Sequence, residues 1–155
     1  MVYVAGALSR RARGLYGPYK YKFSVTNMAD AAPVPEDRPL SGQETTLVRW
    51  MLEHGEPRAA TFLAQLPDAR VVSRCSCGCA SVDFAIAGVK PPPGSLGVLA
   101  DFQFRTPAGH LCGAFVFERA GLLAGLEVYS QDGLSVPSTL PFIETLEETE
   151  IRGAG

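Results

Sequence analysis

The chain has 155 residues, of which 46% are hydrophobic and 19% charged, values that fit one folded domain with a modest core. Its formal net charge of −2 gives no overall attraction for nucleic acid or anionic membranes. No run of about 18 apolar residues appears, so we expect a soluble protein without a membrane-spanning helix. Three of its four cysteines fall within five residues, unlike the spaced framework of disulfide-stapled secreted domains, which favours a cytoplasmic location.

Residues 1 to 39 differ in composition from the rest of the chain. Basic residues precede the first acidic residue, Asp30, and the stretch from Ala31 to Pro39 is rich in proline and has no amphipathic period. We therefore expect residues 1–39 to be disordered or to form an extension. Met28 opens a polar, alanine-rich leader, so Met1–Asn27 is a candidate for a dispensable part of that extension.

A first helix is predicted over about residues 42–54. Ser41 and Glu44 fit the S-x-x-E capping box, in which both side chains satisfy free backbone donors at a helix start. Gly55 is expected to end the helix in the left-handed conformation. The residues at positions i, i+3, i+4 and i+7 form one stripe toward the core: Leu47, Trp50, Met51 and His54.

A second helix is predicted directly after the first. Pro57 suits a first helical turn, and Pro67 with Asp68 breaks the pattern. The apolar residues between them repeat the helical spacing: Ala59, Phe62, Leu63 and Leu66. The two segments together predict a helical hairpin.

From Ala69 onward the apolar period changes to two, which is typical of β-strands. Turn residues and the proline run at 91–93 separate the extended segments. The fold class we expect is α+β, with the N-terminal helical hairpin packed on an antiparallel β-meander of about five strands. This single domain would span residues 40–148, and residues 149–155 would form a flexible tail. The expected strands cover residues 69–75, 82–86, 98–105, 111–118 and 122–129.

A tight cysteine cluster, Cys75, Cys77 and Cys79, lies near the entrance of the predicted sheet. Alternate residues of an extended strand lie about 7 Å apart on one face, too far for sulfurs that share one zinc ion through bonds of about 2.3 Å. Gly78 permits the sharp turn that would bring the three thiols together. The cluster therefore predicts a zinc-stabilised domain as one alternative.

The fourth zinc ligand would be Cys112, or else His110, both at the start of a later strand. The C-x-C-x-C spacing is not that of a zinc ribbon, so the cysteines are alternatively small buried residues or free thiols. A disulfide between residues two apart would be strained and labile, which leaves redox chemistry as a third interpretation. Zinc is thus the one cofactor that the cysteines suggest.

Carboxylates interrupt the apolar strands at alternating positions. Asp83, Asp101 and Glu127 each have apolar neighbours on both sides, so we expect them to share the outer face of the sheet. This face would suit a protein partner, although an ordinary solvated face with weak cross-strand ion pairs is the alternative interpretation. The predicted partner-binding residues are Arg74, Asp83, Asp101, Arg105, Glu127 and Tyr129.

Catalytic patterns are weakly represented in the sequence. The chain has two histidines, His54 and His110, and a Cys–His dyad would have to use His110 with one cysteine of the cluster. It has no phosphate-binding glycine loop, no G-x-S-x-G motif and no H-E-x-x-H motif. We therefore expect a non-enzymatic protein, and a thiol-based redox or hydrolytic enzyme is the second alternative.

Three stretches carry a resemblance to known proteins. Residues 74–84 have the pattern R-C-x-C-G-C-x-S-V-D-F, and residues 40–50 and 121–129 flank it in the same order. The chain resembles a family of small uncharacterised bacterial proteins, some of which occur in toxin-immunity settings. That resemblance implies a single α+β domain that binds a protein partner, and it implies no catalytic residues.

Overall fold

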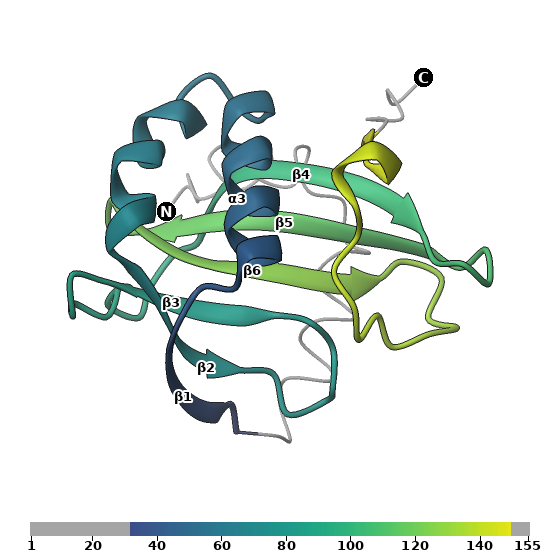
Figure 1. Cartoon of the computed structure of the whole chain (residues 1–155), viewed down its shortest axis with the longest axis horizontal. Coiled ribbons are helices and arrows are strands. Elements are labelled where there is room, and N and C mark those ends of the chain that lie inside the picture. Colours follow the sequence, from purple (N-terminus) through teal and green to yellow (C-terminus); the bar gives the residue numbers. More distant parts are fainter. Residues whose placement is uncertain (1–31, 150–155) are drawn as a thin grey trace, which may run out of the picture.

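The computed structural model of the protein describes residues 32–149, and their strands pair into one antiparallel sheet (Figure 1). The sheet has seven strands in the order β1-β2-β3-β6-β5-β4-β7. The strands are β1 (Val34–Pro39), β2 (Ala69–Arg74), β3 (Val82–Ile86), β4 (Gly97–Arg105), β5 (Leu111–Arg119), β6 (Leu122–Ser130) and β7 (Glu147–Glu148). The helical segments are α3 (Gly42–His54), η1 (Ala59–Asp68) and η2 (Ile143–Thr145).

The sheet consists of two three-stranded blocks, β1-β2-β3 and β6-β5-β4, with β7 at one edge. Antiparallel pairing of Val82 with Leu126 and of Asp83 with Gly125 joins the blocks. The proline-containing connection of residues 87–96 therefore carries the chain from β3 past β6 and β5 to β4. The predicted five-strand meander is wrong, because alternation shows which side chains face inward but not which strand is the neighbour.

The predicted helical hairpin is also wrong. Of the two predicted helices, α3 is an α-helix, whereas η1 is a 3₁₀ helix that contains Pro67. Its buried residues Ala59, Phe62 and Leu66 have the i, i+3, i+7 spacing of an α-helix, so spacing alone could not predict the 3₁₀ conformation. No helix within residues 32–149 is long and apolar enough to cross a bilayer.

The main core lies between the helical segments and one face of the sheet. Figure 1 shows α3 crossing in front of β4, β5 and β6. Helix α3 contributes Leu47, Val48, Met51 and Leu52 to this core, and η1 contributes Phe62 and Leu66. The strands supply the opposite wall, with Val71, Phe84, Leu99, Phe102, Val116 and Leu126 among the buried side chains.

The N-terminus of α3 confirms the predicted capping box. The backbone N–H of Glu44 donates to Ser41 Oγ over 3.1 Å, and the backbone N–H of Ser41 donates to Glu44 Oε2 over 2.7 Å. The expected left-handed end is wrong, because Gly55 has φ −87° and ψ −151°, an extended conformation. Glycine is needed there for a different reason: a Cβ at Gly55 would lie 2.4 Å from the carbonyl oxygen of Leu99 in β4.

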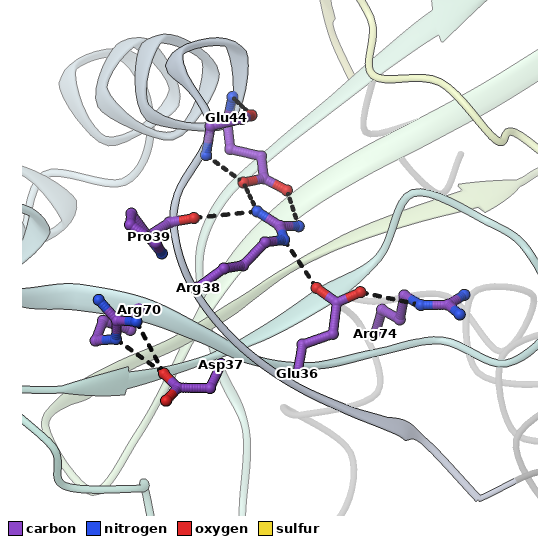
Figure 2. Close-up of polar contacts among 8 residues, drawn as sticks. Glu36, Asp37, Arg38, Pro39, Glu44, Arg70 and Arg74 are labelled. Carbon is purple, nitrogen blue, oxygen red and sulfur yellow. Dashed lines mark hydrogen bonds and ion pairs between the residues drawn. The ribbon is translucent and has the colours of Figure 1, made fainter.

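An ion-pair chain connects β1 and β2 to the start of α3 (Figure 2). The Arg38 guanidinium donates to both carboxylate oxygens of Glu44, over 2.8 and 2.9 Å, and also to Glu36 over 2.8 Å. Glu36 in turn accepts from Arg74 over 3.0 Å. Glu44 is only 5% exposed, so Arg38 neutralises the charge of a buried carboxylate. The same carboxylate caps the start of α3.

Strand β1 lies inside the segment for which we expected disorder or an extension. It pairs with β2 from Val34 opposite Arg74 to Pro39 opposite Arg70, with a register shift between Pro35 and Arg38. An edge strand tolerates prolines because one side of its backbone needs no partner. The expected extension over Met1–Asn27 and the tail after residue 149 lie outside the described residues.

We predict that Gly55→Ala lowers the free energy of unfolding by about 2 kcal/mol, because the added Cβ has no room beside the backbone of β4. Urea denaturation measures this change. The matched control is Gly42→Ala, at a helical glycine whose Cβ would meet nothing within 4 Å, and it should leave stability equal or slightly higher. Equal stability of both variants would contradict the close approach of α3 and β4.

The ion-pair chain gives a second prediction. Arg38→Gln should lower the free energy of unfolding by about 2 kcal/mol, because it leaves the buried Glu44 carboxylate without its cation. Arg70→Gln is the control on the same edge, since its partner Asp37 is 81% exposed in its side chain and the loss should stay below about 1 kcal/mol. Equal losses in denaturation experiments would disprove the special role of Arg38.

The same carboxylate predicts a pH dependence. Burial raises the pKa of Glu44, but the hydrogen bonds from Arg38 and from the Ser41 backbone outweigh it, so the pKa lies below its ordinary value of 4.5. A depressed pKa contributes stability that is complete above the unfolded-state value and is lost as pH falls through the folded-state value. Wild type should therefore lose stability more steeply than Glu44→Gln from about pH 5 to about pH 3. Parallel curves would refute this coupling.

Candidate metal centre

The three clustered cysteines lie in the loop that joins β2 to β3. The strands pair as far as Arg74 opposite Val82, so residues 75–81 form a closed loop. The backbone N–H of Cys75 donates to the Ser81 carbonyl over 3.1 Å and extends the pairing by one step. Gly78, with φ +89°, provides the left-handed residue at which the loop reverses.

The loop brings the three sulfurs together. The Sγ atoms of Cys75, Cys77 and Cys79 all lie within 4.8 Å of one another, and the first two are 2.8 Å apart. All three are free thiols. The backbone N–H of Cys77 donates to Cys75 Sγ and that of Cys79 donates to Cys77 Sγ, each over 3.4 Å. Backbone hydrogen bonds of this kind stabilise negative charge on sulfur, as a thiolate metal ligand requires.

A buried serine holds the base of the loop against β6. Ser81 is 5% exposed, and its Oγ donates to the Val128 carbonyl over 3.2 Å and accepts from the Val128 N–H over 2.9 Å. The Cys79 thiol donates to the same Oγ over 3.3 Å. The backbone N–H of Ala80 donates to the Pro137 carbonyl over 2.9 Å. The loop is therefore fixed at its C-terminal end by two other segments of the chain.

The loop makes the three thiols unequal. Burial opposes ionisation of Cys77, but hydrogen bonds from Cys75 and Cys79 outweigh it and lower the pKa of the Cys77 thiol. Burial raises the pKa of Cys75, and burial raises the pKa of Cys79 to about 12. Cys77, the exposed member, is thus the sulfur that ionises first.

The geometry suits a thiophilic metal ion. Four zinc–sulfur bonds of about 2.3 Å in a tetrahedron place the sulfurs about 3.8 Å apart. The sulfurs of the loop lie within 4.8 Å of one another, so the loop holds all three near that separation. Thiolates favour zinc and copper(I) over magnesium or calcium, which prefer oxygen ligands.

The structure does not bring Cys112 into this group. Cys112 is fully buried on the core side of the sheet, where it pairs with Ser130 of β6 and its Sγ lies 3.6 Å from Ser135 Oγ. His110 is not a member either, and its Nδ1 lies 3.8 Å from Asp132 Oδ2. Within residues 32–149, His110 lies beside Asp132 and outside the cysteine group, so the Cys–His dyad considered from the sequence gains no support. Strand β6 lies between β3 and β5 and separates Cys112 from the loop.

The strand register places most of the predicted partner-binding residues on the outer face, opposite the helices. Asp101 and Glu127 both lie opposite Phe115, and Asp83 lies opposite Gly125, two residues before Glu127. Arg105 lies four residues after Asp101, and Tyr129 lies two residues after Glu127, so strand alternation places both on the same face. This face also carries the aromatic ring of Phe117, which is buried.

Arg74 lies on the other face. It is opposite Val82, a core residue, and forms the ion pair with Glu36 at the helical side of the sheet edge (Figure 2). A register shift between Val71 and Ser73 of β2 changes the alternation there. Such a bulge has no sequence signal in this strand, so counting by twos from Val71 could not assign the face of Arg74.

The outer face is not uniformly exposed. A carboxylate oxygen of Asp101 and the hydroxyl of Tyr129 are buried, and burial raises the pKa of Tyr129. The Tyr129 ring covers Gly113, where a Cβ would approach it to 2.4 Å. A cavity of about 490 Å³ adjoins Asp83, with walls from Pro33, Pro35 and the prolines at 91–93. The face thus combines charged, aromatic and hollowed parts.

Comparison with known proteins identifies no relative: no protein-family model, no curated protein and no solved structure matches the chain.

Proposed function

We propose that this protein binds a thiophilic metal ion, zinc first of all, through Cys75, Cys77 and Cys79. The observation that carries the proposal is the convergence of three free sulfurs within 4.8 Å on one closed loop. Burying or merely exposing three cysteines requires no such convergence. Three sulfurs in reach of one ion do require it, because every metal–sulfur bond is only about 2.3 Å long.

The surroundings of the loop support a metal site in two ways. Backbone N–H groups point at the sulfurs of Cys75 and Cys77, so the loop offers partners to thiolates before an ion binds. The hydrogen bonds of Ser81 to β6 fix the loop, so less conformational entropy is lost when the three ligands are arranged. A bound ion would in return stabilise the turn between β2 and β3.

Binding of a protein partner through the outer face stays a prediction, as does the resemblance to proteins from toxin-immunity settings. The shared face of Asp101 and Glu127 and the neighbouring aromatic rings support it. A metal-loaded loop near that face is compatible with such a partner, since metal binding and partner binding use different residues.

Elemental analysis tests the proposed function directly. Protein purified without chelator or added metal should contain about one zinc ion per chain, because three thiolates from one loop hold one ion. The triple variant Cys75→Ser, Cys77→Ser, Cys79→Ser should lose that zinc and keep its circular dichroism spectrum, since these residues lie in a loop outside the core.

Cys112→Ser is the matched control, because it removes the one cysteine outside the group at nearly constant volume. It should retain zinc at the wild-type level. Absence of bound metal in wild type, even after zinc is added to the reduced protein and the excess removed, would disprove the proposed function.

A further inference from the structure

We infer that a bound ion takes its fourth ligand from outside this chain, in the form of a thiolate. This inference rests on the proposed function and extends it from metal binding to metal exchange with a thiol donor. The basis is the number and position of the side-chain donors around the cysteine loop.

Zinc in proteins is almost always four-coordinate, and structural sites use four protein ligands. The group within residues 32–149 contains three, and no fourth Cys, His, Asp or Glu joins it within 4.8 Å. Cys112 cannot reach the loop without unpacking, because it is fully buried on the core face behind β6. His110 lies with Asp132 beside the 131–134 turn. The donor set of a closed structural site is therefore not present in this part of the chain.

Glu127 is a carboxylate whose charge acts on the loop. Its charge acts on Cys77, but its side chain belongs to the outer face of β6, where its residue lies opposite Phe115. It is not a member of the group within 4.8 Å. Glu127 therefore shapes the field around the site without supplying its fourth ligand.

The loop is accessible to an external donor. Cys77 is exposed and Cys75 and Cys79 are half-buried, so an ion among the three sulfurs faces solvent on the side of Cys77. Three thiolates bind soft or borderline-soft metal ions, and such ions prefer a soft fourth ligand such as another thiolate. Exposure also allows the donor to leave again, which a closed four-cysteine site prevents.

The exchange is a ligand substitution and changes no oxidation state. An incoming thiol releases its proton to solvent as its sulfur binds the ion, and the water molecule that held the fourth position departs. The donor is either a low-molecular-weight thiol or a cysteine of another protein molecule, and both share this chemistry. Further external thiolates can then replace the three chain thiolates one at a time, each released cysteine taking up a proton, so that the ion passes to the donor.

Cobalt(II) titration of the full-length protein tests this inference. The reduced metal-free protein is kept in a buffer with a phosphine reductant and no thiol, and one equivalent of cobalt is added. The near-ultraviolet thiolate-to-cobalt absorbance grows with the number of bound thiolates. Saturating reduced glutathione should raise it by about one third at constant bound cobalt, because four thiolates replace three. Wild type, Cys112→Ser and Glu127→Gln should behave alike.

The possible results separate the two proposals. No thiolate-to-cobalt band in wild type would remove the metal site itself. If glutathione leaves the band unchanged, the external thiolate is overturned and the metal site stands. The same holds if the band is about one quarter weaker in Cys112→Ser, because a chain thiolate was then the fourth ligand. A shift of the visible cobalt band in Glu127→Gln would overturn the external thiolate, because it would identify the Glu127 carboxylate as the fourth ligand. If the absorbance per bound cobalt rises with protein concentration and the protein elutes as a dimer, the external thiolate comes from a second copy of the chain.

Discussion

The site depends on the closure of one short loop. Pairing of Arg74 with Val82 leaves seven residues, 75–81, to reverse the chain, and the side chains at alternate positions must then converge instead of spreading along a strand. Ser81 makes the closure rigid, because its buried hydroxyl uses both the N–H and the carbonyl of Val128. The pairing of β2 with β3 therefore brings the cysteines together, and the junction between β3 and β6 holds the base of the loop in place.

Features determined by local chemistry could be predicted from the sequence. The capping box of Ser41 and Glu44, the extended segments from Ala69 to Ser130 and the turn at Gly78 each depend on residues close in the chain. The convergence of the cysteines belongs to this class, since its one condition was a sharp turn within the cluster. The sequence also contained Arg38, but its contact with Glu44 depends on β1 reaching the sheet edge.

Features determined by long-range pairing could not be predicted. Strand alternation does not distinguish β4 from β6 as the neighbour of β3, so the expected return of Cys112 beside the cluster had no secure basis. Strand β1 was not predicted because it contains prolines at positions 35 and 39. A proline lacks the backbone N–H donor that a central strand needs, but an edge strand tolerates it. The bulge in β2 places Arg74 on the helical face, and η1 is a 3₁₀ helix where spacing alone predicted an α-helix.

X-ray absorption of the zinc-loaded protein is the sharpest test of joint binding by the three cysteines, because it counts the atoms bound to the ion. In thiol-free buffer, we expect three sulfur atoms at about 2.3 Å and one lighter atom. A shell with no sulfur, or with a single sulfur, would show that the three cysteines do not act together on one ion.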